Sequence, residues 1–294
     1  MKVEEFSNCF ASMGAITRWP DETLAVLVNK AKSVYGGVDT WSNELTRRAG
    51  SLVAGLSPAE IQQLQLTGVD AMHSIGKHGR LTMEQLKAGF RRWQSLSGNT
   101  DVANISSADF SSLADFTCGL ELADIHKLDD TTFKRSLGVI GHTSTCSPEQ
   151  RKAYVTKAVS VYGSNVASWS PALVGEMGHL LGVLSADHVK KLSAEHLALV
   201  TPTVIQNFQT EGLMAMSPSQ LRSFSPSQAN AVPQAVYEEM TADQMAALDS
   251  KATLMFIKSV PGTETGSEGG DKDGAPGLVS SIWLAVPLIL MACK

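Results

Sequence analysis

The chain has 294 residues, of which 43% are hydrophobic and 18% are charged, and its formal net charge is -5. Such a composition is that of a folded protein, and the length suits one large domain or two ordinary ones. The basic pairs Arg47-Arg48 and Arg91-Arg92 are isolated, so we expect them to be solvated helix charges and we expect no nucleic-acid partner.

Motifs that start helices recur along the chain. An apolar residue precedes Ser or Thr, often followed by Pro or Ala and then by an acidic or amide residue, as at 56–60, 81–85, 105–109 and 146–150. Ser or Thr can accept hydrogen bonds from the free N–H groups of a first turn, and the acidic or amide residue can close a capping box. Because no useful β-alternating run appears, we expect an all-α fold of short helices.

A longer repeat relates residues 30–64 to residues 157–192, with an offset of 127–128 residues and a one-residue insertion after the glycine. The sequence therefore predicts about two copies of a unit of roughly 128 residues. The matched pairs include Tyr35 with Tyr162 and Trp41 with Trp169. Recurring aromatic residues of this kind are expected to be core anchors rather than a ligand cage.

The middle of the chain holds one glycosylation sequon and two cysteines. Asn104-Ile105-Ser106 is an acceptor for N-glycosylation if the chain is secreted, and a polar loop if it is not. No cysteine lies in a C-x-x-C spacing, so a structural zinc site is unsupported. Cys118 and Cys146 can form a disulfide in an oxidising compartment, and the alternative is two reduced core thiols.

Apolar residues then recur every eight positions through the C-terminal half. An octad cannot be the stripe of one long helix, because eight residues at 100° rotate it by about 80° per repeat. We therefore expect a solenoid-like superhelical array of short helices that bury their faces against neighbours. The first series is Leu184, Leu192, Val200, Phe208, Met216, Phe224, Val232, Met240, Leu248 and Phe256, and the second runs from Val189 to Met245.

The composition changes near the C-terminus. We expect a helical ectodomain over 1–257, a flexible linker over 258–277 and a hydrophobic segment over 278–294. The apolar run of about 16 residues is shorter than the roughly 20 that span a bilayer. A polar spacer and a short apolar end match the signal for a GPI anchor, which replaces the tail with lipid.

The predicted attachment residue is Ser267, with Gly269 and Asp273 as alternatives. A tail-anchored membrane helix and a buried C-terminal core helix are the competing interpretations of the tail. The N-terminus carries no signal peptide, so we expect an upstream portion to be missing. Cys293 would leave with the tail, and Cys9 would then find its partner upstream.

No catalytic, cofactor or metal site emerges from the sequence. No G-x-S-x-G, Walker A or G-x-G-x-x-G motif occurs, and no histidine pair forms a zinc-protease helix. His188 and His196 stand at equivalent octad positions, so repetition explains them without a ligand role. We expect a protein that is not an enzyme.

The helix starts, the V-Y-G…W-S unit of 34–42 and 161–170, the Cys118 and Cys146 pair and the C-terminal signal together resemble the mesothelin, stereocilin and otoancorin family. That resemblance implies a superhelical stack of short helices at the outer face of the plasma membrane. It implies adhesion to other cells or matrix, with a mucin-like glycoprotein or an extracellular gel as partner. The alternative from the sequence is a tail-anchored intracellular helical scaffold.

Overall fold

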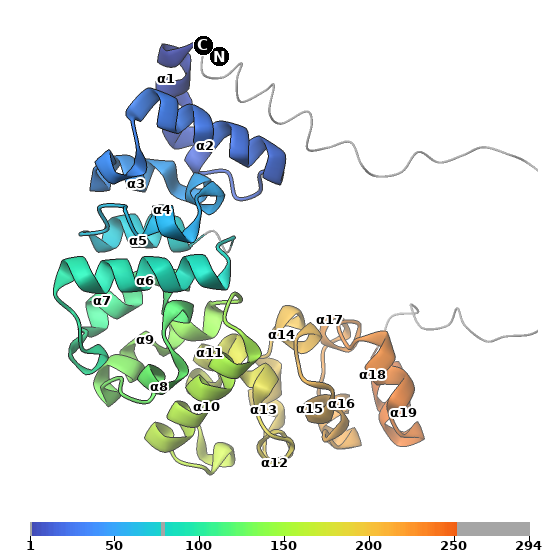
Figure 1. Cartoon of the computed structure of the whole chain (residues 1–294). Coiled ribbons are helices and arrows are strands. Elements are labelled where there is room, and N and C mark those ends of the chain that lie inside the picture. The colour runs from blue at the N-terminus through green and yellow to red at the C-terminus, as the bar shows by residue number, and fades with distance from the viewer. Residues whose placement is uncertain (1, 78–79, 252–294) are drawn as a thin grey trace, which may run out of the picture.

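The computed structural model describes residues 2–77 and 80–251, and every regular element in these ranges is a helix. The elements that lie outside the octads come first (Figure 1). They are α1 (Val3–Gly14), α2 (Asp21–Tyr35), η1 (Val38–Thr40), α3 (Asn43–Ala49), η2 (Gly50–Gly55), α4 (Pro58–Ile61), α5 (Val69–Gly76), α6 (Met83–Ser97), η3 (Val102–Asn104), α7 (Ser107–Ser112), η4 (Ala114–Gly119), α8 (Leu122–Ile125), α9 (Asp130–His142), α10 (Pro148–Tyr162), η5 (Val166–Ser168), α11 (Pro171–Met177) and η6 (Gly178–Val183).

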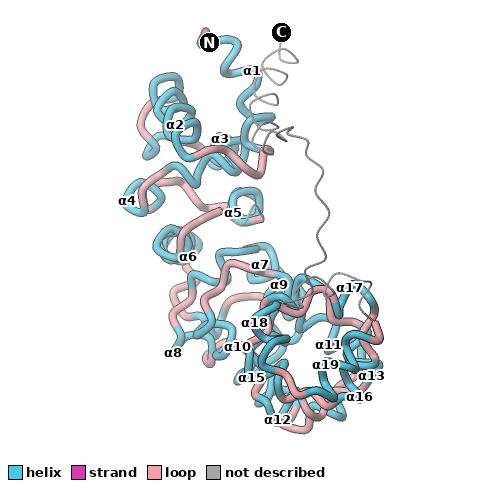
Figure 2. The backbone as a smooth tube through the Cα atoms, turned by 90° about the vertical axis from the view of Figure 1, so that its right-hand side faces the viewer, coloured by secondary structure: helices cyan, strands magenta, loops and turns pink. Residues whose placement is uncertain are grey.

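The octad region forms eight further short helices. They are α12 (Ala186–Val189), α13 (Ala194–Ala198), α14 (Pro202–Gln206), α15 (Thr210–Met214), α16 (Pro218–Arg222), α17 (Pro226–Ala229), α18 (Gln234–Glu239) and α19 (Ala242–Asp249). Figure 1 shows a stack that descends from α1 to α10 and an arm that then extends sideways to α19. Figure 2 looks along this arm, whose helices appear as a ring.

The eight-residue period places one apolar residue before each helix of the arm and one within it. The first series is buried throughout, from Leu184 to Leu248, and Phe256 lies outside the described residues. In the second series, residues Val189 to Ala229 are fully buried, and Tyr237 and Met245 pack against the core from half-buried positions. Helices three steps apart contact each other, as α12 does α15 and α16 does α19. The octad is therefore the spacing of a packed core.

Ser106 caps α7 without the capping box expected at 105–109, but the helix starts at 56–60, 81–85 and 146–150 and four in the arm contain one. In each, a Ser or Thr hydroxyl accepts a hydrogen bond from the backbone N–H at the third helical residue, whose side chain accepts one from the N-cap N–H. This pairing satisfies donors that a short helix otherwise leaves free. The boxes are Ser57 with Glu60, Thr82 with Gln85, Ser147 with Gln150, Ser193 with His196, Ser217 with Gln220, Ser225 with Gln228 and Thr241 with Gln244.

The glutamines of these boxes also join distant parts of the chain. Gln228, which is 4% exposed, donates from Nε2 to the carbonyl oxygens of Leu197 and Val200 at 2.7 and 2.6 Å. Gln85, Gln150, Gln220 and Gln244 bridge two carbonyl groups in the same way. All of these acceptors lie 28–32 residues earlier in the chain. One side chain thus caps its own helix and fastens it to an earlier layer.

His196 takes the place of glutamine at the start of α13. Its Nδ1 accepts from the backbone N–H of Ser193 at 3.3 Å, and its Nε2 lies 2.9 Å from the carbonyl oxygen of Trp169. The side chain is 3% exposed. A structural role for His196 is therefore confirmed.

The order of elements recurs at about half the spacing of the sequence repeat. A 15-residue helix begins at Asp21, at Met83 and again at Pro148. Each is followed by a three-residue 3₁₀ turn, a short α-helix, a six-residue 3₁₀ helix and a four-residue α-helix. Trp41 and Trp169 end the first and third turns and are buried, each donating its indole N–H to a glycine carbonyl oxygen. These two tryptophans are core anchors, as predicted.

Close backbone crossings accompany this recurring order. A Cβ added at Gly50 would lie 2.4 Å from the Gly14 oxygen, and one at Gly178 would lie 2.3 Å from the Gly141 oxygen. Both Gly50 and Gly178 open a six-residue 3₁₀ helix with φ near +47° and +46°. Ala114 opens the third such helix with φ +50°, where it faces Gly76. Ala114 thus carries a conformation that favours glycine.

Replacing Gln228 by glutamate tests the bridging amide. The Gln228→Glu variant keeps the size of the side chain but sets a carboxylate against the carbonyl oxygens of Leu197 and Val200. We expect a loss of about 2–4 kcal/mol in the free energy of unfolding, measured by urea denaturation, because buried acceptors lose their donor. The exposed Gln206 is the control, since Gln206→Glu should change stability by less than about 0.5 kcal/mol. Equal effects would refute the bridging role.

The left-handed conformation at Ala114 predicts a stabilising substitution. The Ala114→Gly variant should gain about 0.5–1 kcal/mol, because relief of the left-handed strain exceeds the entropy cost of glycine. The converse substitution, Gly178→Ala, should destabilise by more than that amount, since its Cβ would collide with the Gly141 oxygen. Thermal unfolding of both variants checks the pair, and a lower midpoint for Ala114→Gly would contradict the argument.

Candidate functional site

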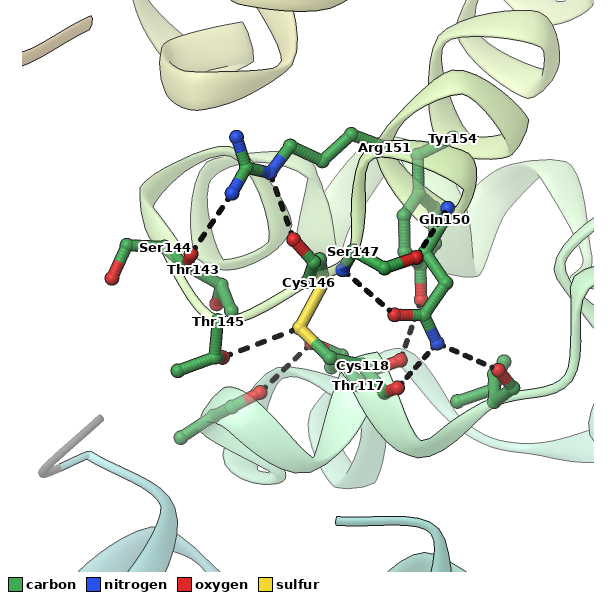
Figure 3. Close-up of a disulfide and its surroundings, with 12 residues drawn as sticks. Thr117, Cys118, Thr143, Ser144, Thr145, Cys146, Ser147, Gln150, Arg151 and Tyr154 are labelled. Carbon is green, nitrogen blue, oxygen red and sulfur yellow. Dashed lines mark hydrogen bonds between the residues drawn. A yellow bond between two sulfur atoms is a disulfide. The ribbon is translucent and has the colours of Figure 1, made fainter. Parts of the chain in front are cut away.

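The cysteines of the middle region form a disulfide within the core. Cys118 and Cys146 are bonded, with their Cα atoms 4.8 Å apart, and are 0% and 2% exposed. The bond joins the end of η4 to the residue before the Ser147 cap of α10, as Figure 3 shows. The disulfide therefore ties together segments that are 28 residues apart in sequence. Cys9 is buried in α1, and no described cysteine is a free thiol.

The surroundings of the disulfide are hydrogen-bonded and structural. The Gln150 amide donates to the carbonyl oxygens of Cys118 and Leu120, and the Tyr154 hydroxyl donates to the Thr117 oxygen at 2.8 Å (Figure 3). Burial raises the pKa of Tyr154 far above its ordinary value. Arg151 donates to carbonyl oxygens on either side of Thr145. No nucleophile is activated here, because these polar groups hold backbone oxygens in place.

The other predicted modification residues fall in different parts of the chain. Asn104 is exposed and ends η3, and the Ser106 hydroxyl accepts a hydrogen bond from the Asp109 N–H at the start of α7. The asparagine is therefore on the surface, next to a helix start. The candidate lipid-attachment residues Ser267, Gly269 and Asp273 lie outside the described residues.

Several acidic side chains of the described region belong to ion pairs or helix starts. A hydrogen bond from Lys87 lowers the pKa of Glu121, which also pairs with Arg91. Backbone hydrogen bonds at the start of α9 lower the pKa of Asp129, the N-cap residue there. A general acid would need a raised pKa instead. Within residues 2–77 and 80–251, no three histidine, cysteine or acidic side chains converge as a metal site.

A polar groove lies between α3 and α5, next to α7. A depression of about 550 Å³ is lined by Arg47 and Asp70, His73, Ser74, Lys77 and Ser112. A smaller one of about 200 Å³ shares Arg47, Ser74 and Lys77 and extends to the end of α1 and Arg48. We name these two depressions together the α3–α5 groove. The groove was not predictable from the sequence, in which Arg47-Arg48 is an isolated basic pair far from Asp70 and Lys77.

Local contacts hold the side chains of the α3–α5 groove in place. The Ser74 hydroxyl donates to the Arg47 carbonyl oxygen at 2.8 Å, which ties α5 to α3. The Arg47 guanidinium pairs with Glu44 through two hydrogen bonds of 2.8 Å, and Arg48 lies over the Phe10 ring. The last turns of α3 and α5 both carry basic residues, where cations favour the negative helix end. Basic side chains from two helices therefore meet on one surface.

None of the helices within residues 2–77 and 80–251 combines the length and the apolar character that crossing a bilayer demands. The hydrophobic segment at 278–294 lies beyond the described part of the chain.

Comparison with known proteins identifies distant relatives, although no family model matches the chain. Mouse otoancorin is 22% identical over 304 aligned residues, which cover all of this chain and 26% of the relative. Human otoancorin is also 22% identical, with the same coverage of both chains. Mouse stereocilin is 23% identical over 81% of this chain and 14% of its own length.

The chain spans about a quarter of the length of the otoancorins and less of the stereocilins. The likeness nevertheless runs over the whole of this chain in both otoancorins. Its distant, full-length similarity is therefore to otoancorin and stereocilin, and with them to the mesothelin, stereocilin and otoancorin family.

Proposed function

We propose that this protein is a GPI-anchored, non-enzymatic cell-surface protein whose helical ectodomain attaches cells to other cells or to matrix. The similarity of the whole chain to otoancorin and stereocilin is the observation that carries the proposal. Their family comprises extracellular attachment proteins. The shortage of catalytic constellations in the sequence supports a role in binding.

The C-terminal sequence supports lipid anchoring. A polar stretch over 261–277 precedes a short apolar run that ends at Cys293. This order matches the signal for GPI attachment, with Ser267 as the proposed attachment residue and Gly269 or Asp273 as alternatives. The mature protein then lacks its hydrophobic tail and is held at the outer face of the plasma membrane by lipid.

The architecture supports a surface that presents binding faces. We propose a superhelical array in which each sequence unit of roughly 128 residues comprises two of the shorter units that begin at α2, α6 and α10. Stacked short helices expose an elongated surface for their size, which suits a large extracellular partner. The proposed partner is a mucin-like glycoprotein or an extracellular gel, and the proposed glycan on Asn104 would also face outward.

Phosphatidylinositol-specific phospholipase C tests the anchor. Cells that express the chain behind a signal peptide should release it into the medium on treatment, because the enzyme cleaves the lipid and not the protein. Flow cytometry and immunoblotting of the medium give the measurement. Retention on the cells after treatment would favour a membrane-spanning tail and contradict the anchor.

A matched pair of tail variants serves as the control for that release. Leu284→Arg with Leu288→Arg interrupts the apolar run and should abolish surface display, whereas Leu284→Ile with Leu288→Ile should preserve it. Ser267→Trp should lower display if Ser267 is the attachment residue, since small residues are required there.

The disulfide tests the extracellular placement and the stability of the ectodomain together. Protein taken from the cell surface should yield a Cys118–Cys146 peptide on non-reducing mapping. The double variant Cys118→Ala with Cys146→Ala should lose about 3–4 kcal/mol of unfolding free energy, because the bond closes a 28-residue separation. Free thiols at both positions in native protein would place the chain in a reducing compartment and overturn the proposal.

A further inference from the structure

We propose that the α3–α5 groove binds an acidic saccharide, that is, a sugar chain carrying carboxylate or sulfate groups. The inference rests on the proposed function, because such chains meet the protein outside the cell. It adds the chemical class of a ligand and the residues that contact it. The proposed contact residues are Arg47, Asp70, His73, Ser74, Lys77 and Ser112.

Arg47 and Lys77 are the cations of the groove that can contact an acid group of a ligand, and Glu44 and Asp70 offset part of their charge. Arg47 and Lys77 are exposed and line both depressions, and His73 is exposed on the helical turn before Lys77. Lys77 forms no ion pair within the described residues, so its ammonium group is available to a ligand. Arg47 pairs with Glu44 along one edge of its guanidinium and can still donate from the other.

Asp70 decides between classes of anionic ligand. Its carboxylate is exposed and lines the groove with Arg47, so it disfavours an anion that offers it no hydrogen-bond donor. A sugar chain carries hydroxyl donors as well as acid groups. Its hydroxyls can donate to Asp70 while its acid groups contact the cations, so both kinds of side chain are used.

The walls of the groove also argue against a peptide. Among the described residues, the lining side chains are charged, hydroxylic or imidazole, and the apolar ones are the methyl groups of Ala11 and Ala15. Peptide anchors require apolar or aromatic pockets, which this groove lacks. The hydroxyls of Ser74 and Ser112 already donate to backbone oxygens, so their oxygen atoms remain as acceptors for sugar hydroxyls.

Binding of defined hexasaccharides to the purified full chain tests the inference. Fluorescently labelled hyaluronan hexasaccharide supplies carboxylates alone, heparin hexasaccharide adds sulfates, and maltohexaose is neutral. We expect at least one acidic probe to bind and the neutral probe not to bind. Binding should weaken as sodium chloride rises from about 0.05 to 0.5 M, because salt screens exposed charges. The two acidic arms distinguish carboxylate from sulfate recognition, and failure of both overturns the inference.

Variants locate the binding to the groove. Arg47→Gln with Lys77→Gln should weaken binding about fivefold or more, whereas the exposed pair Lys190→Gln with Lys191→Gln should change it less than about twofold. Asp70→Ala should also weaken binding if sugar hydroxyls donate to the carboxylate. Tighter binding by Asp70→Ala would identify a simple polyanion site and overturn the saccharide assignment.

The saccharide-binding test and the test of the lipid anchor can fail independently. The hexasaccharide measurements need no membrane, and phospholipase release needs no ligand. Lack of hexasaccharide binding by a chain that phospholipase still releases would overturn this inference alone. Circular dichroism and thermal midpoints of each variant confirm that it is folded, because Asp70 lies in the first turn of α5.

Discussion

The array depends on a buried side-chain amide at the start of a helix. A short helix leaves most of its backbone N–H and C=O groups without partners, and it is unstable alone. In this protein one glutamine accepts from its own N-cap and donates to two carbonyl groups about 30 residues earlier, as Gln228 does. The same residue therefore caps its own helix and joins it to an earlier layer.

The remaining features follow from this layered construction. Layers also approach each other closely at backbone level. The backbone of Gly14 contacts that of Gly50, and the backbone of Gly141 contacts that of Gly178, with no room for a side chain. The buried Cys118–Cys146 disulfide crosses between two such layers, next to Gln150.

Much of the fold could be predicted from the sequence, and the misses have physical causes. The octads predicted the buried residues of the arm because one apolar position per eight residues is a strictly local pattern. The shorter recurring order was hidden because the middle copy has Ile105 where the others have Trp41 and Trp169. Its 3₁₀ helix likewise begins at Ala114 in place of glycine. The order of elements is shared by the three segments that begin at α2, α6 and α10. The tryptophan and the glycine occur only in the first and third.

The sequence by itself determined where helices of the arm start, which described residues are buried in the octads, and the composition of the C-terminal segment. Each of these is written within a few consecutive residues, as hydroxyl caps, apolar spacing or composition. Tertiary structure alone decided what each glutamine amide bridges and which basic side chains share a surface. Arg47 and Lys77 lie 30 positions apart and meet only because α5 packs on α3, a contact that no local pattern encodes.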